Sequence, residues 1–302
     1  MVSCKICEEE FADESFIGRH LRKHGISVAA YYESYFPKRD LLTGEKIVFK
    51  DFEHYSRTEF VSYQNLQSWM SKRSKEEVEG TVSRLLSTYA KQKRISSAPS
   101  LVELRSANLP TPNDLYKVGL DYYQIIRKLG LQTKRKLPTE IGPKKRPDRI
   151  QIDTREKKPL EFDCEIIREK LDFGDYAESK SSSLFIERKS LPDFINTLSG
   201  NYVRFQKELL RARAAGANII IAVEEYLEWA INFQQIDWIT RFTSARPEFI
   251  FHRVREILHQ FENVQFFFVR RHVLPDYVSL FIGNPNLFEE YDLQLLHYLS
   301  WI

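Results

Sequence analysis

The stretch from Asp172 to Asp193, DFGDYAESKSSSLFIERKSLPD, constrains the fold of this chain more than any other. Asp175 and Glu187 are separated by eleven residues rich in Ser and Lys, and an apolar triplet leads directly into Glu187. This pattern predicts a strand, a hairpin turn and a second strand. Because side chains alternate along a strand, Glu187 and Lys189 share one face and Arg188 lies on the other. Pairing of the two strands brings two carboxylates and one ammonium together.

Such a face suits the hydrolysis of a phosphodiester. Two carboxylates can hold a hard cation such as Mg2+ or Mn2+, which polarises a phosphoryl oxygen and lowers the pKa of a bound water. Lys189 is expected to orient that water or to offset negative charge in the transition state. A hairpin of mixed charge that merely faces solvent is the alternative that this stretch alone leaves open.

Two neighbouring segments extend the pattern. Residues 149–153 read as a strand that ends in Asp153 and continues as Thr154-Arg155-Glu156, and the second strand of the hairpin opens the motif ERKSLPD. Together with GDY at 174–176, these segments resemble the XPF-type (ERCC-four-like) nuclease domain, a branch of the PD-(D/E)xK restriction-endonuclease fold. The resemblance covers roughly Arg149 to Glu225 and implies an α/β restriction-endonuclease-like core, which we expect over residues 150–302.

The resemblance also implies roles for individual residues. Asp175 and Glu187 would be ligands of the catalytic metal, with Asp153 as a further acid at the metal site. Lys189 would be the catalytic ammonium. Asp193 would belong to the catalytic set by supporting Arg188 or Lys189.

The N-terminus carries a second metal-binding pattern, Cys4-x2-Cys7-x12-His20-x3-His24. Two thiolates from a hairpin and two imidazoles one helical turn apart make a closed tetrahedral site that suits structural Zn2+. Residues 1–26 are therefore predicted to form a ββα C2H2 zinc finger, with Phe11 and Ile17 as its core positions.

The base-reading positions of such a finger would be Asp13, Phe16 and Arg19, of which only Arg19 is a usual reader of bases. We interpret the finger as an auxiliary DNA clamp, with a protein contact as the alternative. The sequence HGISVAAYYESYF that follows is similar to the layout of phage and bacterial free-standing homing-type endonucleases. Its tyrosines either stack on bases or pack in a core, and core packing is the favoured interpretation.

Residues 27–131 are predicted to form a small all-α region that binds DNA, with a helix-turn-helix as one arrangement. Apolar residues recur at helical spacing over Lys75 to Lys93. Three short helices follow at Ser100–Ser106, Thr111–Val118 and Leu120–Leu129, with Ser100 and Thr111 as caps. Arg127 and Lys128 are expected to contact the DNA backbone, whereas a purely structural spacer is the alternative.

Residues 132–149 form a predicted basic linker. From Thr133 to Arg149 the chain holds seven Lys or Arg against Glu140 and Asp148, and three prolines and a glycine prevent a long helix. The linker is expected to contact phosphates without reading sequence, and a solvated tether is the alternative. Its candidate DNA contacts are Lys134, Arg135, Lys136, Lys144, Lys145 and Arg146.

The remaining chain alternates between helices and strands. Helices are predicted at Asp193–Leu198, Tyr202–Ala215 and Glu248–Phe261, and buried strands at Gly216–Val223 and Val264–Val269. In the second helix Val203, Leu209 and Leu210 are expected to face the core. Arg204 on that helix, like Arg188, is a candidate DNA contact, and solvated charge is the alternative. The histidines His252, His259 and His272 show no ligand pattern and are interpreted as structural or solvated.

Length and composition set the outer limits. The chain has 302 residues and a net charge of only +3, so affinity for nucleic acid must come from local clusters of charge. Three cysteines, two of them in the zinc pattern, argue against a disulfide framework, and no apolar run is long enough to cross a membrane. We expect an intracellular, cytoplasmic protein of a bacterium or a phage-infected cell.

These observations lead to one main hypothesis and two alternatives. The main hypothesis is a metal-dependent DNA endonuclease, targeted by the zinc finger and the helical region, with a homodimer on DNA as one mode of action. The first alternative is a structure-specific repair nuclease for branched DNA. The second is a regulator that binds DNA on a nuclease scaffold without cutting, which predicts that the carboxylates are lost. All of the carboxylates are present.

Overall fold

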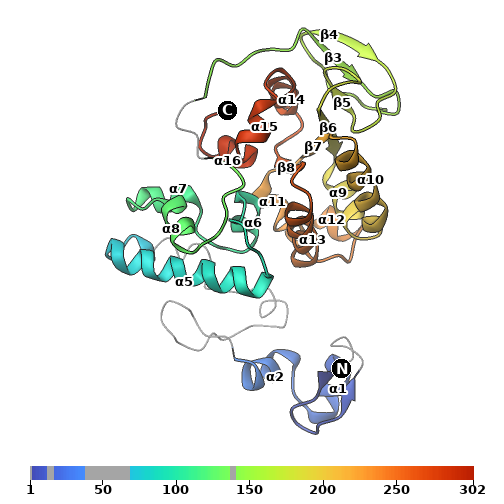
Figure 1. Ribbon diagram of the computed structural model, residues 1–302. Coiled ribbons are helices and arrows are strands. Elements are labelled where there is room, and N and C mark those ends of the chain that lie inside the picture. Colours follow the sequence, from blue (N-terminus) through green and yellow to red (C-terminus); the bar gives the residue numbers. More distant parts are fainter. Residues whose placement is uncertain (1, 12–16, 38–68, 137–140) are drawn as a thin grey trace.

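The computed structural model describes residues 2–11, 17–37, 69–136 and 141–302, without the side chains of Val2 and Ile17. In Figure 1 the N-terminal finger lies below a helical region and an α/β core. The base-reading positions Asp13 and Phe16 lie outside the described residues. None of the described helices is both long and apolar enough to cross a bilayer.

A six-stranded sheet forms the centre of the core. Its order is β4-β3-β5-β6-β7-β8. The strands β3, β5 and β6 pair antiparallel, whereas β3 and β4 are parallel and β6, β7 and β8 are parallel. The strands are β3 (Arg149–Ile152), β4 (Glu165–Arg168), β5 (Tyr176–Ala177), β6 (Leu184–Lys189), β7 (Asn218–Val223) and β8 (Val264–Phe268). The predicted hairpin is thus confirmed as β5 and β6, whereas β4 was not foreseen.

Helices cover both faces of this sheet. Ile219 and Ile221 of β7 belong to one apolar cluster and Ile220 to the other, so β7 is buried on both sides as predicted. One face packs against α9 (Leu191–Leu198), α10 (Tyr202–Ala214), α11 (Leu227–Ala230), η3 (Phe233–Gln235), α12 (Asp237–Thr240) and α13 (Pro247–Gln260). The other face packs against α14 (Leu274–Gly283), α15 (Asn286–Glu290) and α16 (Leu293–Tyr298).

The buried face of α10 differs from the predicted one. Leu209 is buried, but Val203 is 66% exposed and Leu210 is 39% exposed. The buried stripe starts at Tyr202 and continues at Phe205, Leu209 and Ala212, which are three or four residues apart. Val203 and Leu210 each lie one position after this stripe, so the helix turns them towards solvent.

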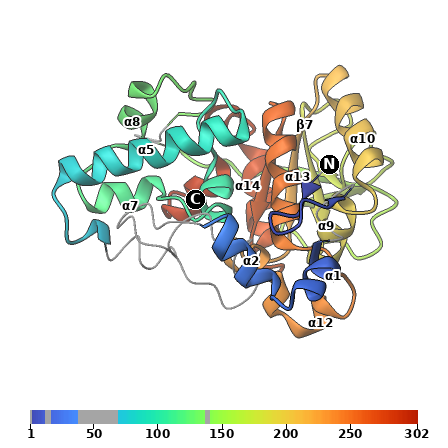
Figure 2. The ribbon, with the colours of Figure 1, turned by 90° about the horizontal axis from the view of Figure 1, so that it is seen from below.

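The described part of the helical region combines one long helix with short ones, and a side chain caps the N-terminus of each. The helices are α5 (Lys75–Lys93), α6 (Leu101–Ser106), α7 (Pro112–Lys117) and α8 (Tyr122–Lys128). Ser100 and Thr111 cap α6 and α7 as predicted, each in a reciprocal capping box. Viewed from below, α5 lies with α7 and α8 on one side of the molecule, and α9, α10 and α13 lie on the other (Figure 2).

The N-terminal part has the ββα order predicted for a zinc finger. Its elements are β1 (Val2–Ser3), β2 (Glu10–Phe11), α1 (Ile17–Leu21), the 3-10 turn η2 (Arg22–His24) and a further helix α2 (Val28–Tyr35). Leu21, Tyr31 and Tyr32 form a small core with partly buried Phe11. The Tyr31 hydroxyl also accepts a hydrogen bond of 2.8 Å from the backbone N–H of Lys5. Tyr31 and Tyr32 are thus core residues, as the favoured interpretation expects.

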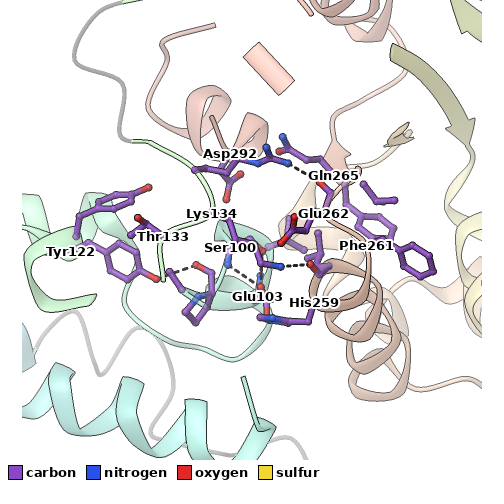
Figure 3. Close-up of a pocket in the computed structure, with 18 residues that line it drawn as sticks. Ser100, Glu103, Tyr122, Thr133, Lys134, His259, Phe261, Glu262, Gln265 and Asp292 are labelled. Carbon is purple, nitrogen blue, oxygen red and sulfur yellow. Dashed lines mark hydrogen bonds and ion pairs between the residues drawn. The ribbon is translucent and has the colours of Figure 1, made fainter. Parts of the chain in front are cut away.

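Helix α6 joins the helical region to the α/β core. The carboxylate of Asp292 caps α16 and also accepts a bond of 2.8 Å from the backbone N–H of Leu101, at the start of α6. His259 of α13 reaches the buried carboxylate of Glu103 at 2.7 Å (Figure 3). Its other ring nitrogen lies 3.1 Å from Ser97 Oγ. We refer to these five residues as the joint. His259 is therefore structural, in line with its interpretation from the sequence.

The basic linker is anchored on the core rather than free. Lys134 Nζ donates to the carbonyl of Leu258 at 2.8 Å, and Arg135 donates to the carbonyls of Glu262 and Glu289. Lys136 lies beside Glu290, with 3.7 Å between Nζ and the carboxylate. Backbone carbonyls and a carboxylate thus already engage these three cations, whereas the Lys136 side chain is still 73% exposed. Their contacts with phosphates stay predictions.

The far end of the linker is anchored as well. The backbone N–H and C=O of Lys145 both bond to the side-chain amide of Asn284. A Cβ on Gly283 would lie 2.3 Å from the Lys145 carbonyl, so only glycine permits this approach. The side chains of Lys144, Lys145 and Arg146 remain exposed.

The joint generates a stability prediction. We expect His259→Ala to lower the free energy of unfolding by about 2 kcal/mol, because it leaves the Glu103 carboxylate buried without its imidazole partner. Urea denaturation followed by circular dichroism measures the change. The matched control is His252→Ala on the same helix, where the side chain is 48% exposed and little change is expected. Equal effects of the two variants would contradict a structural role for His259.

Candidate active site and metal sites

A tight backbone approach brings Asp175 to β6. The backbone N–H of Asp175 donates to the carbonyl of Ile186 at 2.8 Å, and the backbone N–H of Arg188 donates to Asp175 Oδ2 at 2.8 Å. Gly174 precedes this contact with a φ of +60°, and a Cβ there would lie 2.8 Å from the Ile186 carbonyl oxygen. The glycine of the GDY segment is therefore needed to place the carboxylate.

The second carboxylate and the ammonium come from β6. Lys189 Nζ donates to Glu187 Oε1 at 2.8 Å and lies 5.4 Å from the centre of the Phe205 ring. Arg188 points to the opposite side of the sheet, so the predicted alternation is confirmed. Asp175 and Glu187 line one cleft of about 260 Å³ beside α10.

The acid pair changes the protonation of Asp175. Burial, followed by the negative charge of Glu187, raises the pKa of Asp175 to about 7, against the opposing hydrogen bond from the Arg188 backbone. The positive charge of Lys189 opposes this rise without cancelling it, and both carboxylates line a cleft that is open to solvent. A divalent cation would relieve this repulsion, and carboxylate oxygens are the donors that Mg2+ and Mn2+ prefer. The residues present therefore fit a hard cation, with Asp175 and Glu187 as its ligands.

The Asp153 carboxylate is directed towards Arg155 rather than towards Asp175 and Glu187. This buried carboxylate accepts two hydrogen bonds from the Arg155 guanidinium, at 2.7 and 2.8 Å, and one of 2.8 Å from the Leu171 backbone. Burial opposes the charged form, but the bonds from Arg155 hold the pKa of Asp153 at about 2. Within the described residues Asp153 forms no three-ligand group with Asp175 and Glu187. The expectation of a further acid at the metal site is not supported by this geometry.

Asp193 also departs from its expected role. Its Oδ2 accepts a hydrogen bond of 2.6 Å from Ser190 Oγ, and its backbone N–H bonds to the same hydroxyl. The pair caps the N-terminus of α9. Asp193 thus begins the helix after β6 and makes no contact that supports Arg188 or Lys189 directly.

Arg188 belongs to a charge network behind the sheet. Its guanidinium forms bonds of 2.9 and 3.0 Å to Glu156 and one of 2.8 Å to Glu224, and Arg271 bonds to Glu224 at 2.7 Å. Although burial lowers the pKa of Arg188, the two carboxylates raise it above its ordinary value. The Arg188 side chain is 13% exposed, so the network leaves it little surface for DNA.

The other candidate DNA contacts differ in their availability. Arg19 and Arg127 are exposed. Lys128 pairs with Glu79, and Arg204 pairs with Glu208 at 3.1 Å beside the cleft. The predicted pairing of Arg204 with Glu208 is therefore confirmed, whereas contacts of these cations with DNA stay predictions.

Two cleft arginines were not singled out from the sequence. Arg155 and Arg211 line the same cleft as Asp175 and Glu187. Arg155 stands two residues after Asp153, which follows β3. A cation so close to the end of a strand could have been suspected as a site residue. Arg211 lies on the outer face of α10 and carries no local signal, because only the fold brings it over Phe173, at 5.1 Å from the ring centre.

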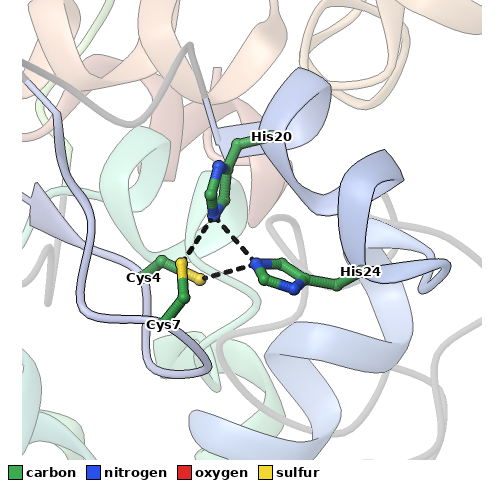
Figure 4. A group of neighbouring side chains, drawn as sticks. All are labelled: Cys4, Cys7, His20 and His24. Carbon is green, nitrogen blue, oxygen red and sulfur yellow. Dashed lines mark hydrogen bonds between the residues drawn. The ribbon is translucent and has the colours of Figure 1, made fainter.

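The four predicted zinc ligands converge (Figure 4). Their donor atoms all lie within 4.8 Å of one another, with 3.0 Å between the Nε2 atoms of His20 and His24 and 3.2 Å between Cys7 Sγ and His20 Nε2. Burial raises the pKa of the Cys4 thiol, but hydrogen bonds with the backbone of Ile6 and Cys7 outweigh it and favour the thiolate. Two thiolates and two imidazoles at these distances fit a tetrahedral Zn2+ site.

The α/β core has recognisable relatives. Residues 152–274 match the ERCC4 domain. This match contains the whole acid, acid, lysine set and confirms the XPF-type resemblance, extending it beyond Glu225. No curated protein matched the chain.

Two solved structures are similar to part of the chain. Both are XPF from Aeropyrum pernix, one of them in complex with DNA, and each has 18% identity to this chain. Their TM-scores are 0.35 and 0.34, and they cover 46% and 44% of this chain. The chain spans 66% and 59% of those two proteins, less than two thirds of either.

The raised pKa of Asp175 has a consequence for stability. Its pKa rises from 3.8 to about 7 on folding, so the stabilising effect of the bound proton is complete below pH 3.8 and is lost as the pH rises through 7. We therefore expect Asp175→Asn to raise the free energy of unfolding at pH 8 in EDTA by about 1 to 2 kcal/mol. The gain should shrink towards pH 5.

Urea denaturation at the two pH values measures this effect. Asp163→Asn, at an exposed position, is the matched control and should show no such pH dependence. A loss of stability in Asp175→Asn at pH 8 would contradict the repulsion between the two carboxylates.

The N-terminal cluster predicts zinc content. We expect purified protein to carry about one Zn2+ per chain and Cys7→Ser to lose it, because a four-ligand site cannot close with three. Inductively coupled plasma mass spectrometry gives the metal content. Cys164→Ser lies outside the cluster and should retain the metal. Full zinc content in Cys7→Ser would contradict the assignment.

Proposed function

We propose that this chain is a metal-dependent endonuclease that hydrolyses phosphodiester bonds in DNA. The observation that carries the proposal is the approach of Asp175 to Glu187 beside Lys189 in an open cleft, with the pKa of Asp175 at about 7. Such a pair of carboxylates is unfavourable without a cation, and it suits the binding of a cation. The match of residues 152–274 to the ERCC4 domain supports a DNA nuclease.

Each residue of the cleft has a chemical task under this proposal. Asp175 and Glu187 would hold Mg2+ or Mn2+, which when bound polarises the phosphodiester and lowers the pKa of water. The ammonium of Lys189 donates a hydrogen bond of 2.8 Å to Glu187. Lys189 orients the attacking water and offsets the charge that develops on the phosphate. Gly174 and the Arg188 backbone fix the Asp175 carboxylate, so that the ligands are positioned before DNA arrives.

DNA targeting would fall to the parts outside the cleft. Arg19 of the finger and Arg127 of α8 are exposed, as are Lys144, Lys145 and Arg146 at the end of the linker. These cations suit contacts with backbone phosphates, which give affinity without reading sequence. Lys134 and Arg135 are less available for phosphates because they already bond to the core.

The test is a cleavage assay with Mg2+, Mn2+ or EDTA. Plasmid and labelled linear, flap and fork DNA serve as substrates, since the chemistry of the cleft is the same for linear and branched DNA. We expect cutting that requires the metal and falls about a thousandfold in Glu187→Gln, because the variant loses several kcal/mol of metal-derived stabilisation. Glu178→Gln, the same change on the exposed turn of the hairpin, should cut like the wild type.

The outcomes separate the candidate functions. Equal DNA binding by wild type and Glu187→Gln without any cutting would favour a non-catalytic regulator. A strong preference for flap or fork DNA would identify a structure-specific nuclease, and cutting of linear duplex at defined places would identify a site-directed one.

A further inference from the structure

The guanidinium of Arg155 is fixed by an unusually complete set of bonds. Nε and Nη2 bond to the two oxygens of Asp153 at 2.7 and 2.8 Å, and Nη2 also donates to the Leu171 carbonyl at 3.0 Å. The Asp153 side chain is only 1% exposed, whereas that of Arg155 is 63% exposed. The buried Asp153 carboxylate thus holds one edge of the exposed Arg155 guanidinium. In the described part of the chain no hydrogen bond engages Nη1, which leaves its two N–H groups for a ligand.

A second arginine is held over the same segment of chain. Arg211 Nη2 donates to the carbonyl of Asp172 at 3.0 Å, and its guanidinium lies 5.1 Å from the centre of the Phe173 ring. The two arginines are therefore anchored on Leu171, Asp172 and Phe173. These residues lie just before Asp175, the first of the two proposed metal ligands. Any shift of that ligand would carry both cations with it.

Both arginines line the cleft together with the two carboxylates. The cleft is otherwise unfavourable for an anionic DNA backbone, because Asp172 and Glu208 line it in addition to Asp175 and Glu187. Guanidinium groups bind phosphates with two parallel N–H donors and stay charged at every working pH. Arg204 is less suitable, since it is tied to Glu208 on its own helix and has no bond to the segment before Asp175.

We propose that Arg155 and Arg211 form a subsite for a DNA backbone phosphate adjacent to the one that is cut, and that Asp153 is the positioning residue of Arg155. This inference rests on the proposed nuclease function and assigns it a substrate contact. The subsite would fix the register of one strand relative to Glu187 and Lys189, as phosphate contacts do without reading bases. It also gives the buried acid at the end of β3 a task other than binding metal.

The chain offers a closely matched control arginine. Arg213, also on α10, donates to the carbonyl of Gln260 at 3.1 Å and lies 5.2 Å from the centre of the Phe261 ring. Its anchorage thus copies that of Arg211, but it does not line the cleft. Arg213→Gln therefore removes the same charge and the same type of contact at a different place.

The experiment measures binding to DNA in which single phosphates are neutral. Oligonucleotides with one methylphosphonate at successive positions are titrated by fluorescence anisotropy with Ca2+ in place of Mg2+, using the substrate that the cleavage assay selects. Wild type is compared with Arg155→Gln, Arg211→Gln and Arg213→Gln. We expect wild type to lose about tenfold in affinity at one or two positions near the cut. Arg155→Gln and Arg211→Gln should bind natural DNA about tenfold more weakly and lose nothing further at those positions.

Two further variants separate positioning from simple charge. Arg155→Lys keeps the charge without the fork and should recover only part of the affinity. In Asp153→Asn, the loss of DNA affinity caused by the methylphosphonate at that position should be smaller than in wild type. The affinity of this variant for Mn2+, measured by calorimetry, should stay that of wild type. A large loss of Mn2+ affinity in Asp153→Asn would instead make this residue a metal ligand and overturn its positioning role.

The result that overturns the subsite is a position profile in Arg155→Gln and Arg211→Gln equal to that of wild type and of Arg213→Gln. This outcome is distinct from failure of the proposed function. If wild type cuts DNA and Glu187→Gln does not, but the profiles are equal, the nuclease stands and the subsite is wrong. If nothing cuts but the profiles differ as expected, with the scan made on the tightest-bound DNA, the two arginines bind a backbone phosphate as inferred and the nuclease is wrong.

Discussion

The close approach of two carboxylates is the constraint on which the active part of this protein depends. Burial of Asp175 and, after it, the negative charge of Glu187 raise the pKa of Asp175. Backbone hydrogen bonds from both neighbouring strands hold Asp175 in place, and only a glycine at 174 lets the chain come this near to β6. The sheet thus supplies the free energy that keeps an unfavourable pair of charges ready for a cation.

The opposite face of β6 shows the complementary arrangement. There Arg188 bonds to both Glu156 and Glu224, so the charges of the network are paired. Alternation along one short strand therefore separates two sets of side chains: Glu187 lines the cleft, and Arg188 belongs to an ion network on the opposite side. Because Arg188 also donates its backbone N–H to Asp175, the network holds the strand that positions Asp175 and Glu187.

How far the sequence predicts this structure depends on the range of the interaction. Helix starts at Ser100 and Thr111 and the two faces of β6 follow from local rules of capping and alternation, and the structure agrees with them. The partner of Asp153 is also local, but a carboxylate at a strand end has the same sequence signature whether it binds a metal or an arginine. The burial of α10 and the anchoring of the linker depend on surfaces that only the assembled fold creates.

The anchored linker changes how the two halves can cooperate. A flexible basic tether would let the helical region search for DNA independently of the cleft. Here Lys134 and Arg135 bond to the core near the start of the linker, and Lys145 bonds to it near the end. Helix α6 is fixed by Asp292 and by the contact between Glu103 and His259. Contacts made by α7 and α8 are therefore at a set distance from Glu187. Under the proposed function, positioning of this kind would determine where a strand is cut, even when none of the contacts reads a base.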